Sequence, residues 1–207
     1  MPEDKKARIA VLVSGGGTNL QALLDAEKRG EIPHGRIVLV LSGNPAAYAL
    51  ERAKAAGVTA RAFSRKQLGG QEAFEKALLA ALDEEKIDLV ILAGFLSILS
   101  ADFTRRYERR MINVHPSLIP AFCGEGYYGL RVHEAALARG VKVTGATVHF
   151  VNEIPDGGEI ILQKAVAVEE GDTPEILQKR VMREAEWKLL PQAAELVSAE
   201  IVQTKNR

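Results

Sequence analysis

Apolar residues are distributed along the chain in a way that predicts alternating strands and helices. Continuous apolar runs at residues 9–13 and 37–41, and a run at residues 87–93 that only Asp88 interrupts, are typical of strands buried on both faces. Between these runs, apolar residues recur at helical spacing, for example within residues 20–30 and 74–82. Alternation of this kind predicts an α/β fold, in which a parallel sheet is covered by helices on both faces.

Proline and glycine set the bounds of several further elements. Asn44 followed by Pro45 predicts the start of a helix that ends at Gly57, and residues 58–63 follow as a short third strand. A buried strand at residues 111–115 is stopped by a proline.

The carboxyl-terminal half departs from the parallel pattern. Residues 142–151 and 159–168 read as two strands joined by a glycine-containing turn, which predicts a hairpin. Thr173 and Pro174 then open a terminal helix. The sequence therefore predicts a mostly parallel sheet with an antiparallel strand pair near the carboxyl end.

A glycine-rich turn, Ser-Gly-Gly-Gly-Thr-Asn at residues 14–19, joins the first strand to the first helix. Such a turn offers unpaired N–H groups and the positive end of a helix dipole to an anion. It lacks the Gly-Lys-Ser/Thr of a P-loop, and the second strand is not followed by the acidic residue of a dinucleotide site. We interpret it as a phosphate site for a mononucleotide or sugar phosphate, with a simple tight turn as the alternative.

The strand at residues 111–115 carries the most distinctive polar pair. Asn113 and His115 are two residues apart, so they share a face at the carboxyl end of the strand. An amide N–H beside an imidazole suits a reaction that creates an oxyanion and moves protons. Ligands gather at the carboxyl ends of parallel strands, so this pair, residues 94–99 and the glycine turn are expected to face one crevice. The alternative is that His115 is a structural residue that only makes local hydrogen bonds at the end of the strand.

Composition narrows the classes of function. At 207 residues, a single domain is expected. The 27 basic and 27 acidic residues give a net charge of zero, which argues against nucleic acid or an anionic membrane as a partner. The only cysteine is Cys123, which excludes an internal disulfide and a cysteine-based zinc site. Because no apolar run is long enough for a signal peptide or a membrane span, a cytoplasmic protein is expected.

Five motifs give the sequence a resemblance to a known family. They are SGGGTNLQ (14–21), LAGFLSILS (92–100), NVHPSLIP (113–120), GATVHFV (145–151) and DGGEIILQ (156–163). In this order they resemble the phosphoribosylglycinamide formyltransferases, which are folate-dependent enzymes of purine synthesis. NVHPSLIP with the later DGG is specific to formyl transfer from folate, and SGGGTNLQ narrows the resemblance to the glycinamide ribonucleotide enzymes. It implies one Rossmann-like, three-layer domain over residues 1–207, with its core at residues 8–195.

The resemblance also implies roles for residues of this sequence. Ribonucleotide binding would involve Gly16, Gly17, Thr18, Asn19, Gly94, Pro116 and Glu186, with Glu184 as the alternative to Glu186. The folate pocket would be lined by Leu96, Ser97, Ile98, Leu99, Met111, Asn113 and Val151. The catalytic residues would be Asn113, His115 and Asp156, with Asp156 raising the pKa of His115. The co-substrate would be 10-formyltetrahydrofolate, without a metal ion, and the partners would be small molecules bound by a monomer or homodimer.

The sequence departs from the family pattern at three places. Ser97 and Gln71 stand where the family often has an arginine and a basic residue, so the charged tail of folate is expected to be held differently. The terminal helix carries an extra residue within residues 180–191. The loop at residues 121–129 is longer, and its three glycines and three aromatic residues predict a lid over the crevice, with an ordinary surface loop as the alternative.

Two other functions fit parts of the sequence. Formyltetrahydrofolate hydrolase and methionyl-tRNA formyltransferase share the Asn/His/Asp core, but each carries an additional domain for which this chain is expected to have no room. A non-catalytic phosphate-binding module would use only the glycine turn and would leave Asn113, His115 and Asp156 unexplained. The resemblance therefore favours formyl transfer from folate to glycinamide ribonucleotide over these alternatives.

Overall fold

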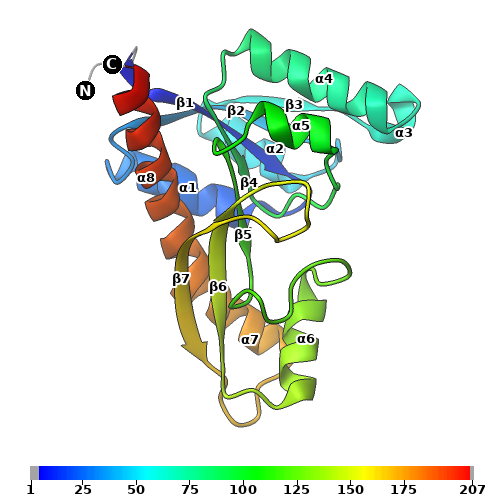
Figure 1. Ribbon diagram of the computed structural model, residues 1–207, viewed down its shortest axis with the longest axis vertical. Coiled ribbons are helices and arrows are strands. Elements are labelled where there is room, and N and C mark those ends of the chain that lie inside the picture. Colours follow the sequence, from blue (N-terminus) through cyan, green and yellow to red (C-terminus); the bar gives the residue numbers. More distant parts are fainter. Residues whose placement is uncertain (1–4, 206–207) are drawn as a thin grey trace.

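A seven-stranded sheet forms the centre of the computed structural model, which describes residues 5–205 (Figure 1). The strand order is β3-β2-β1-β4-β5-β6-β7, and the bounds are β1 (Ala7–Val13), β2 (Gly35–Ser42), β3 (Thr59–Ala62), β4 (Leu89–Leu92), β5 (Met111–His115), β6 (Val143–Phe150) and β7 (Ile160–Ala167). Strands β1 to β5 pair in parallel, whereas β6 is antiparallel to both β5 and β7. The predicted mostly parallel sheet with an antiparallel strand pair near the carboxyl end is confirmed.

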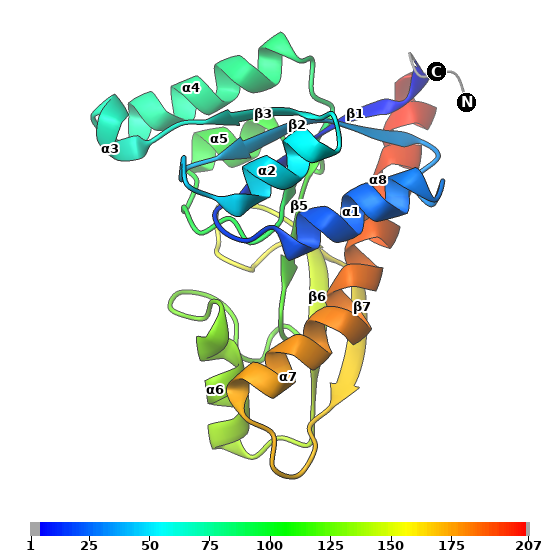
Figure 2. The same cartoon turned by 180° about the vertical axis from the view of Figure 1, so that it is seen from behind.

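Helices cover both faces of this sheet and complete a three-layer, Rossmann-like domain. Helices α4 and α5 pack on one face, and α1, α2 and α8 pack on the other, which Figure 2 shows from behind. The helices are α1 (Thr18–Lys28), α2 (Tyr48–Ala55), α3 (Arg65–Leu68), α4 (Gln71–Glu84), α5 (Ala101–Arg106), α6 (Leu130–Arg139), α7 (Pro174–Val181), the π-helical turn η2 (Met182–Glu186) and α8 (Trp187–Lys205). Within residues 5–205, none of them has both the length and the apolar composition needed to cross a membrane.

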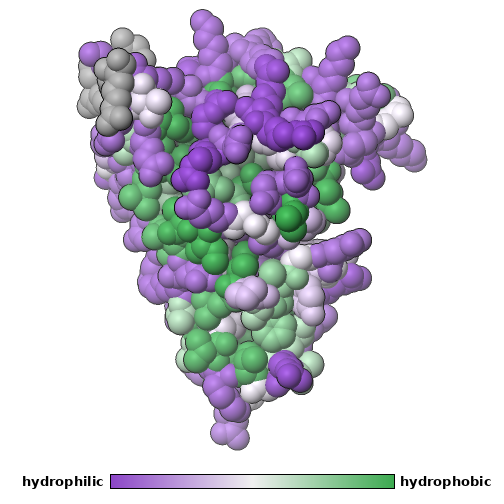
Figure 3. Space-filling view, viewed as in Figure 1, coloured by the Kyte–Doolittle hydropathy of each residue, from purple (hydrophilic) through white to green (hydrophobic). Residues whose placement is uncertain are grey.

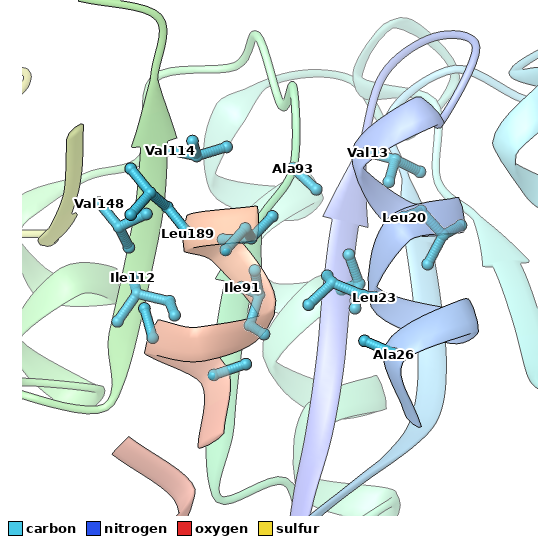
Figure 4. Packing of buried hydrophobic residues seen from close by; sticks show 14 of the residues in the cluster. Val13, Leu20, Leu23, Ala26, Ile91, Ala93, Ile112, Val114, Val148 and Leu189 are labelled. Carbon is cyan, nitrogen blue, oxygen red and sulfur yellow. The ribbon is translucent and has the colours of Figure 1, made fainter. Parts of the chain in front are cut away.

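Strand β1 shows why the sheet is apolar throughout its centre. Ile9, Val11 and Val13 belong to the core cluster on the α1 and α8 side, whereas Ala10 and Leu12 belong to the cluster on the α4 side. All five side chains are fully buried. Figure 4 shows Val13 packed near Leu20 and Leu23 of α1. Burial of a Leu or Ile side chain contributes about 1.5–3 kcal/mol, so a continuous apolar run is stable only where both faces are covered.

Strand β5 follows the same alternation but leads out of the core. Ile112 and Val114 belong to the cluster on the α8 side, and Met111 belongs to the opposite cluster. Asn113 and His115 share the face of Met111 but belong to neither apolar cluster. This face of β5 therefore begins in the core and ends with two polar side chains at the carboxyl end of the strand.

The predicted helix start at Asn44–Pro45 is wrong. Helix α2 begins at Tyr48, after Ala47 in an extended conformation. The side chain of Asn44 instead accepts a hydrogen bond from the N–H of Ala46, at 3.0 Å, and so closes a local turn. The terminal helix also differs from the expectation, because η2 interrupts it between α7 and α8.

Candidate active site

The carboxyl ends of β4 and β5 open into a crevice. Its largest cavity has a volume of about 620 Å³ and is lined mainly by residues 94–98, 113–116 and 124–129. Asn113, His115 and Asp156 all lie in its wall. Figure 3 shows the surface indented at its right edge, between the part that carries α4 and α5 and the part that carries α6. The three predicted catalytic residues thus share one cavity, although 43 positions separate Asn113 from Asp156.

Asp156 lies in the loop between β6 and β7, and glycines shape this loop. Asp156 itself has a positive φ of 54°. A Cβ atom on Gly158 would lie 1.7 Å from the carbonyl oxygen of Phe150, so the loop approaches the end of β6 as only glycine allows. Asn152 braces the loop, because its Oδ1 accepts from the N–H of Ile154 at 3.0 Å. Gly158 is therefore required by the backbone path that carries the Asp156 carboxylate back to β5.

The carboxylate of Asp156 joins the polar residues of the crevice. Its Oδ2 lies 3.3 Å from Nδ1 of His115, and its Oδ1 lies 3.5 Å from Nδ2 of Asn113. The N–H of Gly124 donates to Oδ2 at 2.9 Å. Within residues 5–205, no group of three or more His, Cys, Asp or Glu side chains could hold a metal ion. The arrangement offers an amide, an imidazole and a carboxylate, which are suited to oxyanion binding and proton transfer.

Burial and charge act in opposite directions on the two titratable groups. Burial lowers the pKa of His115 below its ordinary value, while the charge of Asp156 raises it, and burial has the larger effect. Asp156 thus acts on His115 in the predicted direction, but the resulting pKa of His115 is still lowered. For Asp156 itself, burial raises the pKa, but hydrogen bonds and charge from His149, His115 and Gly124 together hold the pKa below its ordinary value. Asp156 is therefore an anion near neutral pH.

The long loop at residues 121–129 is attached to the catalytic residues. The Nε2–H of His115 donates to the carbonyl oxygen of Phe122 at 2.8 Å, since a carbonyl only accepts. Residues 124–129 form one wall of the large cavity, and Gly124 binds Asp156 as described. Both ring nitrogens of His115 are thus engaged, one by Asp156 and one by the loop.

A second cavity, of about 210 Å³, adjoins the first at the amino terminus of α1. All seven residues assigned to the ribonucleotide line it, namely Gly16, Gly17, Thr18, Asn19, Gly94, Pro116 and Glu186. Gly17, the residue that precedes α1, has a φ of 74°, and a Cβ atom on it would lie 2.6 Å from Cβ of Ala49. The turn therefore requires glycine here, and it places the helix amino terminus at the cavity.

Glu186 rather than Glu184 faces this second cavity. Glu186 is buried, and its Oε2 accepts from Nδ2 of Asn19 at 2.7 Å. Glu184 is on the exposed side and pairs with Arg183. The wider turn of η2 carries Glu186 inward, and burial raises its pKa to about 7 despite the hydrogen bond from Asn19. These observations favour Glu186 of the two alternatives left by the sequence.

Glu186→Gln is expected to change the pH dependence of stability. The folded-state pKa of about 7 lies above the ordinary value of 4.5. The free energy of unfolding of the unsubstituted chain should therefore be highest below pH 4.5, where the carboxyl is neutral in both states, and should fall as the pH rises towards 7. Glutamine does not ionise, so its advantage over glutamate should grow by on the order of 3 kcal/mol between pH 4.5 and pH 8. Urea unfolding of the variant and of the unsubstituted chain at both pH values measures this difference in the free energy of unfolding. Glu184→Gln is the exposed control. A difference that is the same at both pH values would contradict the expectation.

Most of the residues assigned to folate lie around the crevice. Leu96 and Ile98 line the large cavity and are 64% and 69% exposed, which leaves apolar surface available to a flat ligand. A small adjoining cavity of about 130 Å³ is lined by residues that include Ser97, Ile98, Leu99, Asn113 and Val151. Met111 differs, because it is fully buried in the core and lines none of these cavities.

Gln71, at the position where a basic residue is frequent, is engaged by neighbouring residues. Its Nε2 donates to the carbonyl oxygen of Ile98 at 2.9 Å and to Oε1 of Glu75 at 2.6 Å. Its Oε1 accepts from Arg65 at 3.1 Å. Gln71 therefore supports the loop that carries Ile98.

Two buried histidines at the site were not singled out by the sequence analysis. His149 lies opposite Asn113 in the β5–β6 register. His133 of α6 lines the second cavity, and burial, followed by the charge of His115, lowers its pKa to about 4. Thr147 and His149 are two positions apart, so they lie on one face of the strand predicted at residues 142–151. Placing His149 at the site also requires the knowledge that β6 pairs with β5, and no local sequence pattern indicates this pairing.

Comparisons with known proteins assign the chain to a family. The sequence profile of the formyl transferase family matches residues 7–194. The chain therefore belongs to the formyl transferase family. Within this family it is similar to phosphoribosylglycinamide formyltransferase from Haemophilus influenzae, with 40% identity over 184 residues that cover 89% of this chain and 84% of that protein.

Other relatives extend the same similarity. The crystal structure of glycinamide ribonucleotide transformylase 1 from Symbiobacterium toebii superposes with a TM-score of 0.88 at 43% identity, covering 96% of this chain and 90% of that one. The trifunctional purine biosynthetic protein adenosine-3 of Bos taurus is 46% identical over 198 residues, which are 95% of this chain. This chain spans 19% of the length of that protein, or about a fifth.

Proposed function

We propose that the chain transfers a formyl group from 10-formyltetrahydrofolate to the amine of glycinamide ribonucleotide. The observation that carries the proposal is the convergence of Asn113, His115 and Asp156 on a cavity that adjoins a second cavity at the amino terminus of α1. The two cavities share Gly94, Leu96 and Pro116 in their walls. A ligand that fills both would therefore have an anionic end at α1 and a reacting group at the three polar side chains.

The substrates fit the two cavities by their chemistry. The phosphate would accept hydrogen bonds from the backbone N–H groups of residues 16–19, at the positive end of the α1 dipole. Glu186 would accept from the ribose hydroxyls. The folate ring system would lie in the larger cavity against the apolar side chains of Leu96 and Ile98, and would extend towards Val151 in the small adjoining cavity. This placement brings the amine of the ribonucleotide and the formyl carbon together beside β5.

The residues at the junction can carry each step of the transfer. The amine attacks the formyl carbon, so a C–N bond forms and the formyl oxygen becomes an oxyanion. An N–H of Asn113 stabilises this oxyanion, a contribution of about 3 kcal/mol for one such donor. His115 would become a second donor when its Nε2–H leaves the carbonyl oxygen of Phe122 for the oxyanion. Asp156 accepts the proton lost by the amine, directly or through a water. The C–N bond to folate then breaks and N10 takes up a proton, so no nucleophilic side chain is required.

The test is release of tetrahydrofolate from 10-formyltetrahydrofolate with and without glycinamide ribonucleotide. Turnover that requires the ribonucleotide, with one formylated product formed per folate released, supports the proposal. Equal release in its absence would favour the hydrolase alternative. Ribonucleotide binding without any turnover would favour the non-catalytic module.

Shortening the loop at residues 121–129 is expected to lower kcat/KM at least about tenfold, because the variant loses the charge-assisted hydrogen bond from Gly124 to Asp156. The thermal midpoint should change little, since residues 121–129 contribute nothing to the two core clusters. Hydrogen exchange in this loop should slow when the ribonucleotide binds, as expected of a lid. Full activity of the shortened chain, with exchange indifferent to ligand, would identify an ordinary surface loop.

A further inference from the structure

Leu96 and Ile98 form an apolar wall of the large cavity, and packing alone does not hold them in place. Their side chains are 64% and 69% exposed. The segment between β4 and α5 that carries them is neither helix nor strand. Phe95 and Leu99 of the same segment pack against the core cluster on the α4 side, but Leu96 and Ile98 do not. The positions of Leu96 and Ile98 therefore depend on the hydrogen bonds that hold the backbone around them.

Two side chains of α4 hold the end of this segment that carries Ile98. Nε2 of Gln71 donates to the carbonyl oxygen of Ile98, as described above. One turn later in α4, Glu75 accepts from Ser100, with Oε1 from the backbone N–H at 2.7 Å and with Oε2 from the hydroxyl. Oε1 of Glu75 also accepts from Nε2 of Gln71 at 2.6 Å, which is possible because residues four apart share a helix face. One carboxylate thus orients Gln71 and holds Ser100.

Glu75 is buried, yet it lies outside the crevice. Its side chain is 7% exposed, and a glutamate is rarely buried unless its carboxylate is paired. It lines none of the three cavities around the crevice. Without Glu75, the N–H of Ser100 and the amide of Gln71 would lose an acceptor that the surrounding apolar cluster does not replace.

The other end of the segment is held separately. The N–H of Leu96 donates to Oγ of Ser14 at 2.9 Å, and Leu96 lines both the large cavity and the cavity at α1. Ile98 lines the large cavity and the small adjoining cavity, but not the cavity at α1. Loss of Glu75 should therefore release the part of the wall that faces folate and leave the ribonucleotide cavity in place.

We propose that Glu75 is a positioning residue that fixes the folate-facing wall of the crevice from helix α4. Through Ser100 and Gln71 it holds the backbone on both sides of Leu99, so that Ile98 stays in the wall. This role rests on the proposed function, because the folate ring system is the ligand that lies against Ile98 there. Glu75 itself touches neither substrate.

The kinetic test uses Glu75→Ala. Because Ile98 loses its support, KM for 10-formyltetrahydrofolate should rise about tenfold, the scale of one lost charge-assisted hydrogen bond. KM for glycinamide ribonucleotide, and kcat with both substrates saturating, should stay within about twofold, because the groups that serve them lie on other elements. An unchanged KM for folate, an equal rise in both KM values, or a loss confined to kcat would overturn the proposal.

Glu75→Gln provides the rescue, and Glu72 provides the matched control. The amide oxygen of glutamine can accept from Ser100 and Gln71, and its N–H can donate to the Ser100 hydroxyl, so KM for folate should stay within about threefold. Glu72 is an exposed residue of the same helix, and Glu72→Ala should leave both KM values within about twofold. If Glu75→Ala lowered the thermal midpoint without separating the two KM values, its role would be structural and the proposal would fall.

Hydrogen exchange tests the contact without catalysis. The amide hydrogens of residues 98–100 should exchange at least about tenfold faster in Glu75→Ala than in the unsubstituted chain, and Glu75→Gln should resemble the unsubstituted chain. Unchanged exchange would overturn the positioning role.

Calorimetric titration with tetrahydrofolate, the released co-product, separates this inference from the proposed function. Its Kd should rise in Glu75→Ala by about the same factor as KM. If the unsubstituted chain binds tetrahydrofolate but transfers no formyl group, the proposed function fails, whereas the titration and the exchange still decide the role of Glu75. A chain that binds no tetrahydrofolate would overturn both.

Discussion

His115→Ala is expected to lower kcat for formyl transfer at least about a hundredfold, the usual scale for an acid–base group. Asp156→Ala should have an effect of the same size, because burial already lowers the pKa of His115 and the loss of the Asp156 charge, which raises it, lowers that pKa further. The double variant should be little worse than either single one, since the two side chains act on one tetrahedral intermediate. Steady-state kinetics with both substrates saturating measure all three variants.

A matched control is available in the same chain. His34 also pairs with a carboxylate, that of Glu195, but lies outside the crevice. His34→Ala should therefore leave kcat unchanged. If the losses at His115 and Asp156 multiplied in the double variant, the two residues would be working independently, and the single-intermediate interpretation would fail.

Gly17→Ala is expected to raise KM for the ribonucleotide at least about tenfold while kcat changes little. The added Cβ would lie 2.6 Å from Cβ of Ala49, and the φ of 74° is unfavourable for alanine by about 1–2 kcal/mol. The turn must therefore shift, and the N–H groups at the start of α1 move away from the phosphate. The reacting groups lie on β5 and in the loop after β6, so the chemical step at saturation should be preserved.

Gly15→Ala is the control for this change. Gly15 belongs to the same turn, but a Cβ atom on it would have no neighbour within 4 Å. In the Gly15→Ala variant, KM for the ribonucleotide should stay within about twofold of the value of the unsubstituted chain, because alanine can adopt the backbone conformation of Gly15 without strain. Equal KM values for the Gly17→Ala and Gly15→Ala variants would show that the phosphate is not bound at this turn.

The strands were predictable because their burial is recorded in local composition. Residues 9–13 and 89–93 are apolar without interruption, and the structure covers both of their faces. The start of α2 was predicted wrongly because the Asn44 side chain can cap a helix or close its own turn, and the sequence does not distinguish the two. Helix α5 has only six residues, too few for apolar periodicity to indicate it.

The candidate site was predictable only as far as its members lie in distinctive motifs. Asn113 and His115 share a strand face, which follows from their spacing alone. The approach of Asp156 depends on β6 folding back beside β5, and the resemblance supplied this rather than any local pattern. His149 was missed for the same reason, because its importance comes from a cross-strand partner.

The π-helical turn η2 shows how a buried helix can take up an extra residue. In a continuous α-helix, one added residue rotates everything that follows by about 100° and would turn the apolar face of α8 away from the sheet. Here the added residue is confined to Met182–Glu186, so Leu189, Leu190 and Val197 keep their places in the core. Length variation within this helix can therefore be absorbed beside the cavity that Met182 and Glu186 line, without a change in the rest of the domain.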